Sequence, residues 1–420
     1  MKEHIKKIIN HPLISGTLVI FLGSLFCNIC NFLFNLFMSR NLSVSDYGIL
    51  ASLMSLLTLA TLPAGSIIPT IINFAASYFA KGELNLVRGL FFKVTKLSFL
   101  AGFCIFLVFF LFVESISQFF NISSESLIIL LGFVIFLSYA GVINGALLQA
   151  KLAFGFISFN SLLGTILKLL LGVILVFLGF AVSGAMWAIF WTGLISYALS
   201  FIPLRFLFKK GAAVSKIEIG KLFAYGAPAA ISLFGLTSFV TTDILLVKHF
   251  FPPAQAGIYA GLSLVGRVIF FFSAPISTVM FPLIVQKHAK EENYKNIFKI
   301  ALFLVFLSSM ALTIFYFLFP EFVIKFFIKR EEYLIISPLL GLFSLFITAY
   351  SLLSIMTNFY LSIKKTKIYI PITLAAIFQA ILIFYLHQNF LQIIIISLSI
   401  TILLLVSLLL YYPHATKNKG

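Results

Sequence analysis

The stretch from Lys216 to His288 decides how this chain folds. It holds two long apolar runs, Ile219–Phe250 and Ala256–Gln286, joined by Phe250-Phe251-Pro252-Pro253-Ala254-Gln255. Each run exceeds the ~20 apolar residues that one membrane crossing needs. The stretch therefore predicts two consecutive membrane-spanning helices connected by a short turn.

Apolar runs of this kind recur along the whole chain. The 420 residues are 61% hydrophobic and 10% charged, whereas a soluble domain is about half apolar and about a quarter charged. Phenylalanine alone contributes 52 residues, too many for a surface that faces water. Because helices satisfy their own backbone hydrogen bonds in lipid, the sequence predicts an all-α polytopic membrane protein.

Hydropathy divides the chain into twelve expected transmembrane helices. The first half gives Leu13–Met38, Tyr47–Phe79, Leu90–Val113, Leu127–Ala150, Ile157–Phe180 and Ser183–Leu207. The second half gives Ile219–Phe250, Ala256–Gln286, Phe298–Phe319, Tyr333–Ile363, Ile368–Leu386 and Phe390–Tyr412. The break at His387-Gln388-Asn389 is the weakest, and a single re-entrant turn is the alternative there.

The distribution of positive charge sets the expected orientation. Most of the 29 lysines and arginines fall in the loops of one side, among them Arg88, Lys151 and Arg205. Loops rich in Lys and Arg stay cytoplasmic, so we predict a multi-pass protein of the inner membrane with both termini in the cytoplasm. The net charge of +17 then reflects topology, and we expect no nucleic-acid partner.

The two halves of the chain repeat one another. At an offset of 209 residues, Gly48-Ile49-Leu50-Ala51-Ser52-Leu53 aligns with Gly257-Ile258-Tyr259-Ala260-Gly261-Leu262, and Ala80-Lys81-Gly82-Glu83 aligns with Ala289-Lys290-Glu291-Glu292. Six spans separate the copies, which makes them parallel repeats. We predict two pseudo-symmetric six-helix lobes, residues 1–210 and 211–420, joined by the basic linker Phe208–Gly220.

The second helix of each lobe carries two prolines, Pro63 and Pro69 in one and Pro275 and Pro282 in the other. Proline removes a backbone hydrogen bond and kinks a helix. One interpretation is bent, tilted packing. The other is a set of hinges that helps a cavity between the lobes to open and close.

No enzymatic motif is visible in the chain: it has no phosphate-binding loop with its lysine, no G-x-S-x-G and no H-E-x-x-H. We predict a protein that is not an enzyme and has no metal site or cofactor, although Na⁺ or H⁺ could act as a coupling ion. The nearby pair Cys27 and Cys30 is interpreted as helix packing.

Three ionisable residues, Lys168, Asp243 and Arg267, lie inside predicted spans, where each costs about 2.5–3.5 kcal/mol. Asp243 and Arg267 either form a buried ion pair between the seventh and eighth helices or face a cavity that receives an anionic substrate or a coupling ion. Lys168 contacts either substrate or carbonyl groups. Arg40 and Lys248 are interpreted first as interface anchors and second as substrate ligands.

Two further patterns refine this prediction. The polar side chains expected to hydrogen-bond between helices are Asn28, Asn31, Asn35, Asn144, Gln149 and Asn358. In the repeat alignment, Arg267 falls opposite Thr58, and Asp243 opposite Phe34. The two lobes thus share the repeat but differ in their charged residues, and we predict that the ionisable residues that contact substrate lie chiefly in the second lobe.

The chain resembles the MOP superfamily of membrane transporters. The resemblance covers essentially the whole chain and includes Arg40-Asn41-Leu42-Ser43-Val44-Ser45-Asp46-Tyr47-Gly48, Asp243-Ile244-Leu245-Leu246-Val247 and Gly257-Ile258-Tyr259-Ala260. Within the superfamily it is most similar to the polysaccharide-biosynthesis flippases of the Wzx type. That resemblance implies a V-shaped cavity lined mainly by the first, second, seventh and eighth helices, and alternating access between two lobes.

The resemblance also implies a substrate and partners. The substrate would be undecaprenyl-pyrophosphate-linked oligosaccharide, moved from the cytoplasmic to the outer leaflet for polysaccharide or O-antigen synthesis. Membrane lipids and glycosyltransferases or a polymerase of the same pathway would be the partners of a monomeric protein. The alternatives are a cation-coupled multidrug (MATE-like) antiporter, a lipid II flippase, and a structural membrane protein with a filled core.

Overall fold

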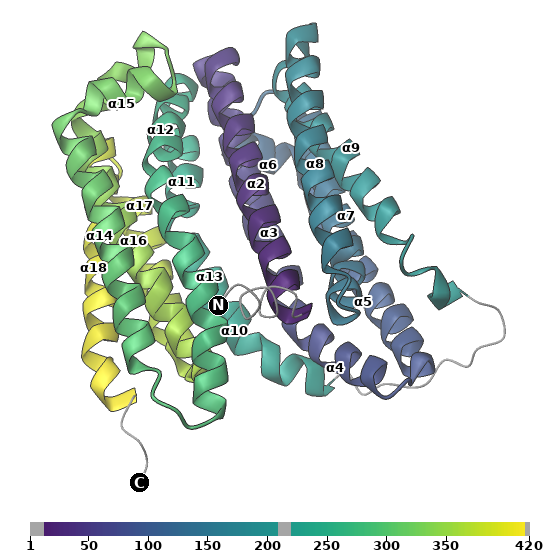
Figure 1. Ribbon diagram of the computed structural model, residues 1–420. Helices are drawn as coiled ribbons and strands as arrows, with labels where there is room; N and C mark the ends of the chain where they lie inside the picture. The colour runs from purple at the N-terminus through teal and green to yellow at the C-terminus, as the bar shows by residue number, and fades with distance from the viewer. Residues whose placement is uncertain (1–11, 209–219, 416–420) are drawn as a thin grey trace, which may run out of the picture. The chain divides into compact units, whose positions relative to one another are not determined.

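The computed structural model describes residues 12–208 and 220–415, and every regular element within them is helical (Figure 1). This confirms the predicted all-α fold. The chain divides into two compact units: Met1–Leu42 with Ala60–Ala227, and Ser43–Leu59 with Pro228–Gly420. The predicted lobe boundary at residues 210 and 211, and most of the predicted linker, lie outside the described residues, so the two lobes 1–210 and 211–420 stay a prediction.

The first unit is built on long helices that pack side by side. Its elements are α2 (Pro12–Asn41), the end of α3 (Val44–Ser66), α4 (Ile68–Ala80), α5 (Leu84–Leu111), α6 (Val113–Phe119), α7 (Glu125–Ala150), α8 (Phe154–Leu175), the π-helical η1 (Val176–Phe180), α9 (Ala181–Ser200) and the 3₁₀ turn η2 (Arg205–Phe208). Helix α8 packs on α2 and α9, and α7 packs on α5 and α9. Gly179, with φ of 89°, supplies the reversal between α8 and α9, a conformation that glycine adopts without steric cost.

The second unit is organised around α16 (Ser337–Ser362). Its other elements are the start of α3, the end of α10 (Gly220–Ser238), α11 (Thr242–Phe250), α12 (Pro253–Gly266), α13 (Val268–Ala289), α14 (Lys295–Leu318), α15 (Pro320–Phe327), η3 (Glu331–Ile336), η4 (Thr366–Ile368), α17 (Tyr369–Tyr385) and α18 (Phe390–Ala415). Helix α16 packs against α12, α13, α14 and α18. It buries Phe343, Phe346 and Phe359 completely, as expected for a helix that is apolar on every side.

The observed helices follow the predicted spans closely. Among the described residues, nine helices are long and apolar enough to cross a membrane, or ten when the bent pair Ala230–Ser238 and Thr242–Phe250 counts as one span. Residues Phe154–Ser200 form one of the nine although they contain the α8–α9 reversal. The weak break at residues 387–389 separates α17 from α18. The multi-pass architecture is confirmed, and the number twelve stays a prediction.

The predicted seventh span is broken in its middle. Helices α10 and α11 meet at an angle of 44°, and the break leaves backbone carbonyls without intrahelical donors. Gln379 of α17 donates to the Phe239 carbonyl at 3.1 Å and to Ser397 Oγ at 2.9 Å. Irregular backbone at membrane depth is tolerated where protein groups satisfy it in this way.

The four prolines lie in two different settings. Pro63 lies inside α3 and Pro69 in the first turn of α4, on either side of the turn at Ile67. Pro275 and Pro282 both lie inside α13, which continues through them as one helix. The interruption in α3–α4 agrees with a local kink, and the proposed hinge role of all four prolines stays a prediction.

Within the second unit, α3 crosses α12 at Gly48 and Gly257. A Cβ added to Gly48 would lie 2.7 Å from the Gly257 amide nitrogen, and one added to Gly257 would overlap the Val44 carbonyl oxygen. The two glycines that the sequence repeat aligns therefore touch one another.

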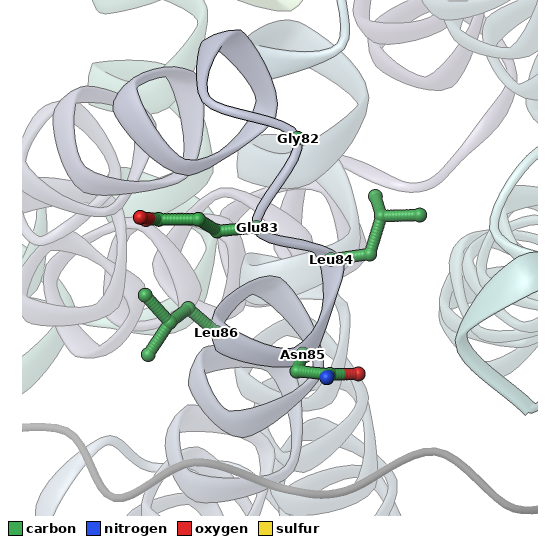
Figure 2. A pocket seen from close by; sticks show the side chains of 5 residues that line it. All are labelled: Gly82, Glu83, Leu84, Asn85 and Leu86. Carbon is green, nitrogen blue, oxygen red and sulfur yellow. The ribbon is translucent and has the colours of Figure 1, made fainter.

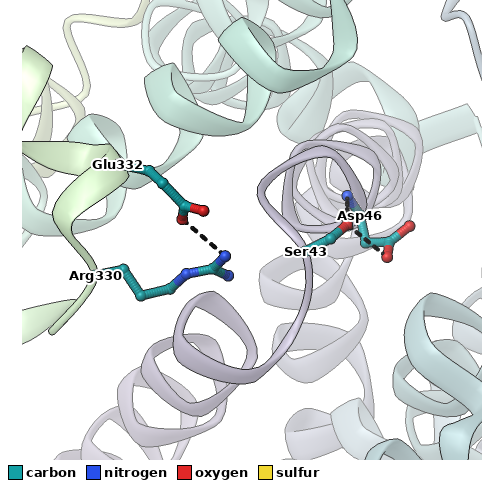
Figure 3. A network of polar contacts seen from close by, with 4 residues as sticks. All are labelled: Ser43, Asp46, Arg330 and Glu332. Carbon is teal, nitrogen blue, oxygen red and sulfur yellow. Dashed lines mark hydrogen bonds and ion pairs between the residues drawn. The ribbon is translucent and has the colours of Figure 1, made fainter.

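Asp46 and Ser43 cap the start of α3: Ser43 Oγ accepts from the Asp46 amide at 3.0 Å and donates to its carboxylate at 2.7 Å (Figure 3).

This crossing predicts a large difference between two glycine-to-alanine substitutions. Gly257→Ala should lower the free energy of unfolding by about 1–3 kcal/mol, because its methyl group meets backbone that cannot rotate away. Gly65→Ala, in the same helix as Gly48, meets no atom within 4 Å and should leave stability unchanged or raise it slightly. Thermal unfolding of the purified variants in detergent measures both. Equal melting temperatures would contradict the crossing.

Candidate functional site

Asp243 is fully buried in the first turn of α11, directly after the break in the seventh span. Its Oδ1 accepts the Ile244 amide at 2.8 Å, and its Oδ2 accepts the Tyr259 hydroxyl at 2.9 Å. A carboxylate in a first helical turn is also favoured by the helix dipole. Tyr259 comes from α12, so this hydrogen bond links the seventh and eighth predicted spans.

Arg267 lies at the junction of α12 and α13. Its guanidinium acts electrostatically on Asp243, Tyr259 and Tyr47. Within the part of the chain that the structure describes, Arg267 and Asp243 form no ion pair within 4.0 Å. The Arg267 Nε and Nη2 atoms are buried and have no hydrogen-bond partner among the described residues. The site thus holds a guanidinium whose donors are not used by its neighbouring carboxylate.

Close helix packing fixes these side chains in place. A Cβ added to Gly266 would overlap the Phe343 ring of α16, so α12 can approach α16 only because residue 266 is glycine. The Phe343 ring meets the Tyr259 ring edge-on, with 6.0 Å between centroids. Tyr316 of α14 donates to the Val265 carbonyl at 3.2 Å. These contacts hold the backbone on both sides of Arg267.

Lys248 lies in the same unit, at the other end of α11. It is 1% exposed and interacts electrostatically with Asp46. Lys248 is thus buried within the second unit, and its roles as interface anchor or as substrate ligand both stay predictions. Arg330 and Glu332 form an ion pair at 2.8 Å in that unit (Figure 3).

Lys168 and Arg40 belong to the first unit. Lys168 Nζ donates to Asn31 Oδ1 of α2 and lies 4.9 Å from the centroid of the Phe34 ring. Arg40 lies in the last turn of α2 and is half-buried. The structure thus places these two cations in a different unit from Asp243, Arg267 and Lys248.

The sequence predicted the charged residues of the site but not all of their hydrogen-bond partners. It named Asp243 and Arg267 but missed Tyr259, which supplies the hydrogen bond. A signal was present, because Tyr259 stands where the other copy of the repeat has the apolar Leu50. Of the amides predicted to bridge helices, Asn31, Asn144 and Asn358 do so, whereas Asn35 donates within its own helix.

A separate recess lies at the turn between α4 and α5, with a volume of about 360 Å³. Its lining is one continuous stretch, Gly82, Glu83, Leu84, Asn85 and Leu86. Figure 2 shows Glu83 and Leu86 extending to one side and Leu84 and Asn85 to the other, so the side chains do not converge on a ligand. Among residues 12–208 and 220–415, no three His, Cys, Asp or Glu side chains are grouped to hold a metal.

Comparison with known sequences identifies the family. The profile of the polysaccharide biosynthesis proteins matches residues 37–331, more than half of the chain. The chain belongs to this polysaccharide biosynthesis protein family. No curated protein matches the sequence at a significant level.

Solved structures show the same fold. An inward-facing multidrug resistance MATE family transporter of the MOP superfamily aligns with a TM-score of 0.72 at 13% identity, covering 95% of this chain and 96% of that one. The lipid II flippase MurJ, in an inward closed conformation, aligns at 0.73 and 15%, covering 94% and 87%. The MATE multidrug transporter DinF-BH aligns at 0.70 and 14%, covering 96% of each chain. This family member therefore has the MOP-superfamily fold.

The Asp243–Tyr259 hydrogen bond gives a second prediction. Tyr259→Phe should lower the free energy of unfolding by about 1.5–3 kcal/mol, because it leaves a fully buried carboxylate with one donor fewer. Tyr316→Phe is the matched control, since it removes a bond to the uncharged Val265 carbonyl, and should cost about 0.5–1.5 kcal/mol. Chemical unfolding measures both variants. Adding Asp243→Asn to Tyr259→Phe should give a non-additive change; strict additivity would show that the two side chains do not interact.

Proposed function

We propose that this family member is a flippase for undecaprenyl-pyrophosphate-linked oligosaccharide, which it moves from the cytoplasmic to the outer leaflet of the inner membrane by alternating access. Membership of the polysaccharide biosynthesis family supports the substrate class. A pyrophosphate cannot cross hydrocarbon without a partner for its charge. A transporter of such a lipid therefore needs a cation that is buried and still able to donate.

Arg267 is the observation that carries this proposal. Tyr259 and the Ile244 amide donate to the oxygens of Asp243, while Nε and Nη2 of Arg267 have no acceptor within residues 12–208 and 220–415. Phosphate oxygens accept from guanidinium in a bidentate geometry and form strong, charge-assisted hydrogen bonds. The role we assign to Asp243 is to offset the Arg267 charge through space while it leaves the Arg267 donors available to substrate.

Further contacts complete the proposal. Lys168 uses one of its three N–H donors on Asn31, and we assign the remainder to the substrate; Arg40 and Lys248 are secondary candidates. We also propose that Na⁺ or H⁺ drives transport, that the protein acts as a monomer, and that glycosyltransferases or a polymerase of the same pathway supply and consume its substrate.

A cation-coupled antiporter is the second candidate. The observation in its favour is the fully buried Asp243 carboxylate, a group that could bind and release a cation. In that case Asp243→Asn would abolish export of a cationic dye, and Arg267→Ala would leave it intact. If the protein is a flippase, Arg267→Ala should instead impair transport, and the transported substrate should be lipid-linked sugar.

Substitution of Arg267 tests the flippase. We expect Arg267→Ala to slow translocation of undecaprenyl-pyrophosphate-linked sugar in reconstituted vesicles at least about tenfold, as loss of a hydrogen bond to a charged group implies. Arg267→Lys should retain part of the rate, because lysine keeps the charge without the planar pair of donors. The rate is measured as sugar that becomes accessible to an enzyme added outside the vesicles.

Lys325→Ala provides the control for this experiment. It also removes one cation from the second unit, but from an exposed pair with Glu321 on α15, and should leave the rate unchanged. Unimpaired transport by Arg267→Ala would remove Arg267 from the mechanism. Faster translocation of lipid II than of the oligosaccharide-linked lipid by the unmodified protein would favour the lipid II alternative.

A further inference from the structure

Three cations of the first unit meet where α9 ends. Arg88 Nη2, from the start of α5, donates to the Phe206 carbonyl at 2.8 Å. Lys151 Nζ, from the end of α7, donates to the Pro203 carbonyl at 3.0 Å, and Arg205 Nε donates to the Ile202 carbonyl at 3.1 Å. We call these three residues, with the backbone of residues 202–208, the α9 corner. Cations at a helix C-terminus are favoured by its unpaired carbonyls.

The three cations of the α9 corner have more N–H donors than the backbone carbonyls accept. Arginine has five N–H donors and lysine three, and each of the three side chains donates to one carbonyl of this backbone. Arg88 is 7% exposed, and its Nε is buried with no hydrogen-bond partner in the described parts of the chain. Among the described residues, no carboxylate forms an ion pair with any of the three. The α9 corner therefore has unused N–H donors and positive charge that an oxyanion could accept from and neutralise.

The walls of the α9 corner are aromatic. The Phe206 ring lies 4.9 Å from Lys151 Nζ and 6.0 Å from the Phe79 ring. Phe208 is 53% exposed and meets the rings of Phe91 and Phe92 edge-on. Rings beside clustered cations are typical of the membrane interface. They would contact acyl chains while the cations contact the head group.

We propose that the α9 corner binds the head-group phosphate of an anionic phospholipid of the leaflet it faces. Arg205 supplies paired N–H donors to the phosphate oxygens, the exposed Lys151 adds a point charge, and the buried Arg88 contributes its charge. The loops that carry these residues are those with the predicted cytoplasmic charge excess, and that leaflet holds anionic lipids. Phospholipid is favoured over a soluble phosphate because exposed rings adjoin the charge. This proposal uses residues of the first unit, whereas Arg267 belongs to the second, and it does not depend on what the protein transports.

Lipid retention by the full-length protein tests the proposal. Purified protein in neutral detergent is mixed with phosphatidylglycerol or phosphatidylcholine, and bound lipid is counted by native mass spectrometry. We expect one phosphatidylglycerol to be retained in preference to phosphatidylcholine. Lys151→Gln combined with Arg205→Gln should weaken retention by about 25-fold, from the contribution of two interfacial cations. Both side chains are exposed, so the fold should survive the change.

The control removes the same charge elsewhere. Lys364→Gln combined with Lys365→Gln changes two exposed lysines on the side predicted to be cytoplasmic, in the second unit, and should leave retention unaltered. Three results would overturn the proposal: equal retention by the α9-corner variant and the unmodified protein, equal loss in the control variant, or displacement of the lipid by inorganic phosphate. The melting temperature without lipid shows whether both variants are folded.

Discussion

The close approach of α3 and α12 constrains how α12 packs in the second unit. Gly257 cannot carry even a methyl group, because the Val44 carbonyl oxygen occupies its place. The same helix buries Gly266 against Phe343 on another side. Close packing of backbones through small residues is how helices associate in lipid, where no hydrophobic force draws them together. Once α12 is fixed in this way, Tyr259 and Arg267 have fixed positions too.

Those positions decide how two buried charged groups share their partners. A direct bidentate Asp243–Arg267 pair would use two of the five guanidinium N–H donors on the carboxylate. Instead the structure gives the carboxylate a tyrosine hydroxyl and a backbone amide and leaves two guanidinium nitrogens without acceptors. An unsatisfied buried donor costs free energy in the resting protein, and a ligand that supplies the acceptor recovers it. The cost is therefore compatible with a binding role and difficult to reconcile with a filled structural core.

Sequence reasoning reached the fold because hydropathy and length are additive properties of a segment. The apolar runs predicted the helices, and even the weak break before Phe390 is present in the structure. The short helices α6 and α15 could not be found this way, since they are too short to give a periodic signal. The repeat aligned Gly48 with Gly257. The contact between them could not be predicted, because it depends on how α3 and α12 cross. Tyr259 was missed for the same reason, because its role appears only once α11 and α12 are packed.

The sequence repeat allows the charged residues of the two units to be compared position by position. Phe34 is the counterpart of Asp243 at the 209-residue offset, and its ring lies 4.9 Å from Lys168 Nζ. Each unit thus has an electron-rich group at this repeat position that interacts with a half-buried cation: a carboxylate in the second and an aromatic face in the first. An aromatic face attracts a cation without carrying a charge of its own. The Phe34 ring therefore cannot neutralise Lys168, whereas Asp243 partly offsets the charge of Arg267.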